Sequence, residues 1–241
     1  MIELRICEIV KMASPFSKSL KRPDHFMKWF SKFFSELSIH SKGLILGLVV
    51  ILAAGGFIGF FMNRSEIQSH LASNAFFLAQ KTLNSEMKGI TTKKLDVDTQ
   101  FSEGVKQLKE IDQLFSSTRA ALETRLKLGA LYYNHGEFSK ALPWYEKAVQ
   151  TASGFDQAVA LLSVGYTYEN LGQPNEAIKN FQKALNLGEL GLKGDLLMGI
   201  TRSYEALHDS AKARSTYDKI LTELPNTEYS KSADVFKSQL E

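Results

Sequence analysis

The sequence predicts an all-α protein in which a single N-terminal transmembrane helix precedes an α-solenoid of paired helices. Two observations carry this prediction. Residues 43–62 contain no charged residue and no proline, and twenty helical residues rise roughly 30 Å, the thickness of a bilayer's hydrocarbon core. Residues 122–225 repeat one apolar pattern every 36 residues, which is typical of stacked helix pairs that share a continuous core.

The leader, residues 1–42, is basic and sets the orientation of the span. It contains eight Lys or Arg residues, whereas only Arg64 and Lys81 occur in the first twenty residues after the span. Because Lys and Arg are retained on the cytoplasmic side, we expect a cytoplasmic N-terminus and a remaining domain across the membrane. In a bacterium this is a single-pass inner-membrane protein with a periplasmic domain. Aromatic residues recur at a spacing of three to four between Phe26 and Leu37. They predict an amphipathic helix on the membrane surface or, alternatively, in the groove of a partner.

The apolar run at 43–62 is best interpreted as an uncleaved anchor. A signal peptide has an apolar region of only about 7–15 residues behind a short basic start, and here some forty residues come first. One face of this helix carries Gly43, Gly47, Gly55 and Gly59. Small residues at this spacing let a second helix approach closely, but glycine is also simply common in membrane helices, and both interpretations stay open.

The 36-residue period is clearest in the second helix of each pair. Small residues stand in register at Ala141, Ala177 and Ala213, and aromatic residues follow four positions later at Tyr145, Phe181 and Tyr217. In the preceding helices Gly129, Gly165 and Thr201 match one another, with Tyr132, Tyr168 and Tyr204 three positions later. We expect the small residues where two helices cross closely and the aromatic residues in the wider gaps between units. This pattern resembles the tetratricopeptide repeat, whose usual period is 34 residues.

The flanking segments complete the array. Residues 101–115 indicate the second helix of a degenerate unit, with Gly104, Leu108 and Ile111 in the key places, and residues 65–87 would be its first helix. The polar stretch 88–100 between them indicates a connector. The tail predicts a capping helix with Asn226 or Thr227 as its N-cap. The predicted organisation is a leader (1–42), a transmembrane helix (43–62), a degenerate helix pair with connector (63–118), and a tetratricopeptide domain of three 36-residue repeats and a capping helix (119–241).

The sequence contains no pattern typical of an enzyme. Its five histidines are scattered and none has a metal-ligand spacing. The adjacent residues His208, Asp209 and Ser210 cannot form a triad, which is defined by geometry rather than adjacency. Asp96 and Asp98 lack the further ligands and the glycine of a calcium loop, and there is no phosphate-binding glycine loop. We therefore expect no catalytic, cofactor-binding or metal site, no cofactor, no nucleic-acid ligand and no small-molecule substrate.

The chemistry that remains is a protein-binding surface. In tetratricopeptide arrays the first helices present a concave groove that holds peptides, and the matching positions mix apolar, aromatic, amide and acidic side chains, a lining suited to a polypeptide. Some of them could instead pack against the first helix pair. Transferring the repeat positions gives the predicted groove: Glu123, Leu126, Tyr133, Asn134, Leu162, Tyr166, Glu169, Asn170, Met198, Arg202 and Glu205, with Val159 and Asp195 beside them.

The overall layout resembles the ancillary subunit of the bacterial SecYEG translocon. The segment STRAALETRLKLGALYYNHGEFSKAL and the small residues from Leu71 to Ala75 carry this resemblance, which spans most of residues 43–150. The resemblance implies an adaptor whose partners are translocon subunits, exported polypeptides or periplasmic chaperones, besides the lipid bilayer. The repeats at 158–225 are closer to generic tetratricopeptide units than that family usually shows. An anchored scaffold for cell-envelope assembly or cell division is therefore the alternative.

Overall fold

The computed structural model describes residues 29, 32, 41–88 and 96–239, and no strand occurs in that part of the chain. The all-α class is thereby confirmed. The chain divides into two units, residues 1–63 and residues 64–241, which we describe separately. The predicted amphipathic helix of the leader and residues 89–95 of the connector lie outside the described residues, apart from Trp29 and Lys32.

In the first unit the described backbone from residue 41 is the beginning of helix α3 (Ser41–Lys88). Among the described residues, α3 is the one helix long and apolar enough to cross a membrane, by length and composition alone, with a mean hydropathy of 1.2 in the relevant window. A Cβ atom built on Gly47, Gly55 or Gly59 would meet no described atom within 4 Å. Gly43 lies in the same helix. The membrane anchor and its packing face remain predictions.

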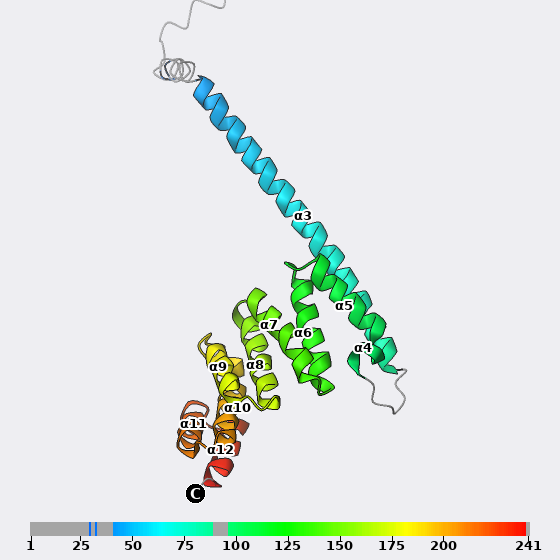
Figure 1. Cartoon of the computed structure of the whole chain (residues 1–241). Helices are drawn as coiled ribbons and strands as arrows, with labels where there is room; N and C mark the ends of the chain where they lie inside the picture. The colour runs from blue at the N-terminus through cyan, green and yellow to red at the C-terminus, as the bar shows by residue number, and fades with distance from the viewer. Residues whose placement is uncertain (1–28, 30–31, 33–40, 89–95, 240–241) are drawn as a thin grey trace, which may run out of the picture. The chain divides into compact units, whose positions relative to one another are not determined.

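The second unit is an array of helix pairs that follow one another in chain order (Figure 1). In α6–α11 the second helix of each pair packs against the first helix of the next, as α7 does against α8 and α9 against α10. The helices after α3 are α4 (Val97–Gln100), α5 (Ser102–Leu114), α6 (Arg119–Asn134), α7 (Phe138–Thr151), α8 (Gly154–Asn170), α9 (Pro174–Leu185), the 3-10 turn η1 (Leu190–Leu192), α10 (Lys193–Ala206), α11 (Ser210–Glu223) and α12 (Glu228–Ser238).

The small and aromatic positions of the repeat meet as predicted. Ala141, Ala177 and Ala213 are fully buried. Phe181 is also fully buried, and its ring lies where Cβ atoms would stand if Gly165 of α8 and Gly199 of α10 carried them. The aromatic side chain of one second helix thus occupies space that two successive first helices leave open because both have glycine there.

The turn within each pair repeats with the same period. Gly136, Gly172 and His208 all have positive φ, at 78°, 69° and 58°. In each turn the residue that follows the one with positive φ donates its backbone N–H to the carbonyl of a tyrosine five residues before it. In the first repeat, Glu137 donates to Tyr132 at 2.9 Å. This bond closes the helix with a left-handed residue, a place where glycine is favoured. The third repeat keeps the geometry with histidine, at a conformational cost that glycine avoids.

The degenerate first pair closes in a related way. Gly104 of α5 lies directly against Leu83 of α3, and the Glu86 carboxylate accepts hydrogen bonds from the backbone N–H groups of Glu103 and Gly104 at 3.1 and 3.2 Å. This carboxylate therefore satisfies donors that the first turn of α5 would otherwise leave unpaired. Leu108 and Ile111 are buried in the same core.

The end of the predicted connector differs from our expectation. Residues 97–100 form α4 rather than an irregular link, with Asp96 as the N-cap, accepting from the Thr99 N–H. Val97 and Phe101 are almost fully buried. Asp98 accepts hydrogen bonds from Lys109, Lys140 and the Tyr132 hydroxyl at 2.7–2.9 Å. Two buried apolar side chains and the Asp98 carboxylate, together with a hydrogen bond from the Val97 N–H to Glu137, hold a segment that is too short to show periodicity.

A buried ion pair joins the first pair to the repeats. The Asp112 and Arg125 side chains are only 8% and 6% exposed, and the guanidinium donates to the Asp112 carboxylate. It also donates to the Thr151 hydroxyl at 2.7 Å and to the Ser116 carbonyl at 2.8 Å, while Lys147 approaches Asp112 at 3.3 Å. Because several donors and acceptors are satisfied together, the buried charges are compensated.

The last helix, α12, resolves the choice of N-cap. Thr227 is the N-cap, and its hydroxyl accepts from the Ser230 N–H while Ser230 bonds back, forming a capping box. Asn226 instead has φ of 62° and lies in the preceding turn. Pro225 lies between α11 and α12, where a proline does not interrupt a helix.

Candidate functional site

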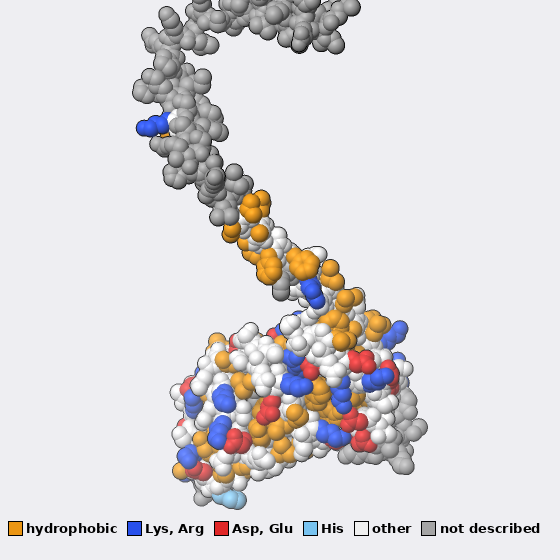
Figure 2. All heavy atoms as spheres, turned by 45° about the horizontal axis from the view of Figure 1, so that its top comes forward, with side chains coloured by type: hydrophobic (Ala, Val, Ile, Leu, Met, Phe, Trp, Pro, Cys, Tyr) orange, Lys and Arg blue, Asp and Glu red, His pale blue; other side chains and the backbone are white. Residues whose placement is uncertain are grey.

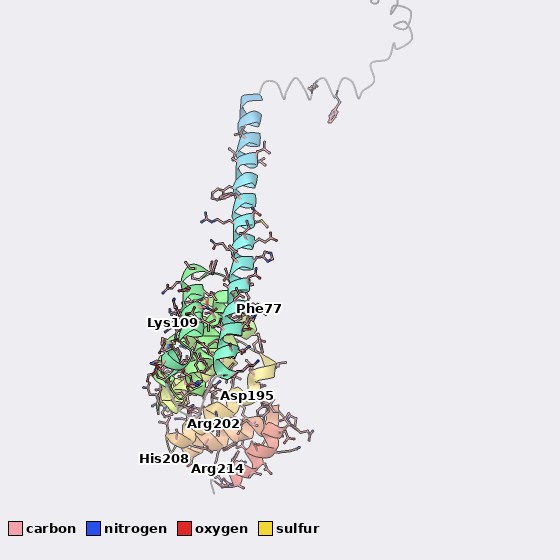
Figure 3. All side chains as sticks on the ribbon, turned by 90° about the vertical axis from the view of Figure 1, so that its right-hand side faces the viewer. Phe77, Lys109, Asp195, Arg202, His208 and Arg214 are labelled. Carbon is pink, nitrogen blue, oxygen red and sulfur yellow. The ribbon has the colours of Figure 1, made fainter. Side chains whose placement is uncertain are left out.

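The predicted groove residues lie on α6, α8 and α10, the first helices of the three repeats. We call the surface that they form the first-helix face. Most of these side chains are half-buried, while Asn134, Asn170 and Arg202 are exposed. Asp195 and Arg202 lie at successive levels of α10, with His208 beyond its end (Figure 3).

Adjacent first helices are linked across this face by hydrogen bonds between predicted residues. The Asn170 amide of α8 donates to the Tyr133 hydroxyl of α6 at 2.8 Å and to the Tyr166 carbonyl at the same distance. Tyr133 also packs edge-to-face against Phe138, with ring centroids 5.2 Å apart. The Tyr133 ring and the Asn170 amide are therefore held in defined positions before any ligand arrives.

A second link joins α8 to α10 through a charged pair. Arg202 donates to Glu169 at 2.9 Å, and its guanidinium lies over the Tyr166 ring at 5.5 Å. Burial raises the pKa of the Glu169 carboxyl, although the hydrogen bond from Arg202 opposes this effect. Tyr166 in turn packs edge-to-face on the buried Phe181, which anchors this group to the core.

The remaining predicted residues divide between packing and exposure. Leu126, Leu162 and Met198 are half-buried against the core clusters, so part of their surface is already used within the chain. Glu205 accepts a hydrogen bond from the Tyr217 hydroxyl at 2.7 Å. Val159 is half-buried as well, whereas the Asn134 side chain is exposed and accessible to a ligand.

The structure adds two residues that the sequence analysis did not include. Arg119 of α6 forms an ion pair with Asp156 of α8 and donates to the predicted residue Glu123 at 3.0 Å. Arg119 and Asp156 are 37 residues apart, the same separation as Tyr133 and Asn170. This separation, one residue more than the repeat period, is the signal in the sequence that places the two members of each pair on successive first helices, but it does not reveal the contacts themselves.

Two hollows of the second unit lie away from the first-helix face. One of about 440 Å³ lies between α3 and α5, and another of about 350 Å³ lies among α9, α10 and α11. Neither contains a predicted groove residue. Within the described residues no group of three or more His, Cys, Asp or Glu side chains could hold a metal ion. The first-helix face itself presents half-buried and exposed side chains from three successive helices, a form that suits a long ligand better than an enclosed small molecule.

Comparisons with known proteins agree with this architecture. Family models described as tetratricopeptide repeat match residues 121–152 and 158–187. No curated protein matches the sequence. Among solved structures, a protein from Podosopora anserina described as a kinesin light chain with nearly identical TPR-like repeats is similar over 72% of this chain and 86% of its own, with a TM-score of 0.52 and 14% identity. A variant of that protein has a TM-score of 0.53 and 14% identity, over 72% of this chain and 85% of its own.

These matches bear on the fold, because an identity of 14% carries no information about partners. The tetratricopeptide fold is typically a non-catalytic scaffold that binds other proteins. The period, the helix pairs and the matched models together show that this chain contains tetratricopeptide repeats.

Proposed function

We propose that this protein is a membrane-anchored adaptor that binds polypeptide segments on its first-helix face. The observation that carries the proposal is the set of aromatic, amide and charged groups that hold one another in place there, Tyr133 with Asn170 and Tyr166 with Arg202. Side chains fixed before binding lose little conformational entropy when a ligand arrives. Aromatic rings and arginine are also the residues that contribute most to protein interfaces.

The polar groups suit the backbone of a peptide. The Asn134 amide is exposed and the Asn170 amide is held beside the Tyr133 ring, and an amide can both donate to and accept from a peptide unit. Glu169 offers a partly desolvated carboxylate, whose partner Arg202 remains 45% exposed. An incoming segment can therefore bond to amides and stack on rings without displacing a buried group.

We further propose that the chain is anchored in a bacterial inner membrane with its N-terminus in the cytoplasm and its repeats in the periplasm. The support is the uncharged run at 43–62 and the excess of Lys and Arg before it. The proposed partners are subunits of the Sec translocon, exported polypeptides or periplasmic chaperones, on the strength of the sequence resemblance over residues 43–150. We propose no enzymatic activity.

Site-specific photocrosslinking in native membranes tests the proposal. A photoreactive residue replaces Asn134 or Arg202 on the first-helix face, and the matched control replaces Lys183, which is exposed on the second helix α9. We expect translocon subunits, nascent exported chains or periplasmic chaperones to crosslink to the first two positions and not to the control. Equal crosslinking from all three positions would contradict a site on the first-helix face.

The identity of the crosslinked protein separates the partner from the site. Crosslinks from positions 134 and 202 to wall-synthesis or division proteins would support the first-helix face as the binding site. They would indicate a role in envelope assembly instead of export. Arg202→Gln should weaken the crosslinks from position 134 several-fold, because it removes the charge above the Tyr166 ring. Lys183→Gln provides the control for a loss of positive charge elsewhere.

A further inference from the structure

The hollow between α3 and α5 is an apolar groove with charged banks, unlike the first-helix face. Ala75 and Ile111 line the groove. The side chains of Leu78 and Leu114 also line it and are 58% and 70% exposed. Figure 2 shows hydrophobic side chains along α3, including its uncharged N-terminal part, whereas the residues of the groove are those given above. Exposed apolar side chains that are grouped around one apolar hollow, rather than scattered singly, mark a candidate contact surface for another protein.

The groove is bordered by one positive and one negative side chain, each on a different helix. Lys81 stands on α3 and Glu110 on α5, and both side chains are exposed. Neither forms an ion pair with another described residue. Leu83 meets Gly104, and Leu78 lines the same hollow as Leu114, so α3 and α5 run antiparallel. This register puts Lys81 and Glu110 about one helical turn from each other along the axis.

This arrangement is self-complementary under a two-fold rotation. An axis running along the groove, parallel to α3, would place α3 of each copy against α5 of the other and would keep every residue at its own height. Lys81 of each copy would then face Glu110 of the other, twice over, and Leu78 would lie about one and a half turns along the axis from Leu114 of the other copy. An isologous interface requires this property, that one patch carries both partners of every contact.

We propose that the α3–α5 groove is the interface of a symmetric, parallel homodimer of this protein. The occupant of the groove is a second copy of the chain, with Leu78 and Leu114 in the apolar centre and the Lys81–Glu110 pairs at the rim. Apolar centres with polar rims are the usual organisation of protein interfaces. The interface leaves the first-helix face free, so that a dimer would present two such faces.

Charge reversal in the full-length chain, purified in a non-ionic detergent, tests the proposal. Lys81→Glu alone and Glu110→Lys alone should each weaken self-association by about tenfold or more, because each would place like charges together twice. Mixing the two variants under different tags should restore association as a heterodimer. In that pair one chain carries two acids and the other two lysines, so both cross-contacts become attractive.

The apolar contact has its own matched control. Leu114→Ser should weaken dimerisation, whereas Val235→Ser on α12, which is 55% exposed in the wild type, should not. Light scattering coupled to size-exclusion chromatography measures the mass, and co-purification through the second tag measures heterodimers. A monomeric wild type, or a dimer that neither charge variant weakens, would overturn the proposal. So would charge variants that fail to pair when mixed, or a dimer that depends on Val235 rather than Leu114.

Discussion

Replacement of Phe181 by alanine should destabilise the repeat unit strongly and in a way that depends on Gly165. The ring is fully buried, and the Cβ that Gly165 lacks would overlap it, while a Cβ on Gly199 would come within 2.7 Å. Truncating a buried phenylalanine costs about 3–5 kcal/mol, because it combines lost transfer free energy with a residual cavity. For a unit of this size, we expect the midpoint of thermal unfolding to fall by about 6–20 °C.

Because Gly165 contacts the Phe181 ring, the packing between them can be measured as the coupling free energy between substitutions at the two positions. In the wild type, Gly165→Ala should bring a loss of about 1–3 kcal/mol from overpacking, partly offset by about 1 kcal/mol of improved helix propensity. In the Phe181→Ala background the added methyl group enters the vacated space, so only the favourable contribution should remain. The two substitutions should therefore be non-additive by about 1–3 kcal/mol.

The assay is circular dichroism of the full-length chain in detergent, followed through thermal and urea unfolding for the wild type, both single variants and the double variant. Phe155→Ala is the control for loss of a phenylalanine ring, because Phe155 is 53% exposed, and should change stability by less than about 0.5 kcal/mol. Additive effects of Gly165→Ala and Phe181→Ala, or a Phe181→Ala cost no larger than the control's, would refute the packing described for the repeat junction.

Three further predictions concern charges and turns. Asp112→Asn should lower the free energy of unfolding in urea by about 3–5 kcal/mol, because it leaves Arg125 buried without its counter-charge. The control is Lys147→Met, at a side chain that is 52% exposed, which should cost less than about 1 kcal/mol. Similar losses in the two variants would argue against the buried pair. Burial acts to raise the pKa of Asp98, but hydrogen bonds from Lys109, Tyr132 and Lys140 outweigh it and hold that pKa below its usual range. The stabilisation of the fold by the Asp98 carboxylate is therefore present above the unfolded-state pKa of about 4 and disappears as the pH falls towards the lower folded value. The difference in melting temperature between wild type and Asp98→Asn should therefore shrink from about pH 5 to about pH 2. A constant difference would contradict this prediction. His208→Gly should raise stability by about 0.5–1 kcal/mol because it relieves a left-handed histidine, while His208→Ala should bring no gain; equal effects of the two would show that the turn carries no such strain.

The helix pairs were predictable because their signal is local and repeated. A small residue such as Ala177 and an aromatic residue such as Phe181 recur at a fixed period, and both proved buried where the repeat requires them. The turn glycines Gly136 and Gly172 follow the same period. The helix α4 escaped prediction because four residues are too few to show a helical period, and its position depends on Asp98 meeting side chains from three other helices.

The candidate binding residues were predictable only as positions. The repeat register assigns Tyr133, Asn170 and Arg202 to first helices, and the structure places them on α6, α8 and α10. Their mutual contacts did not follow from the register, because a hydrogen bond such as the one from Asn170 to Tyr133 depends on helix rotation and on how far each side chain reaches. Whether these residues bind a partner remains a prediction.

The sequence by itself determined the helical class, the 36-residue unit and the uncharged run at 43–62, because each depends on periodicity or on the length of an apolar segment. Only the tertiary structure decided which polar groups are buried and which remain available. In the sequence Arg125 is one charged residue in a helical pattern, and it is buried only because α5 and α7 pack against it. Lys81 and Glu110 instead remain exposed on the two helices that border one groove. The physical reason is that burial of a charge depends on partners far away in the chain, and a local pattern does not record them.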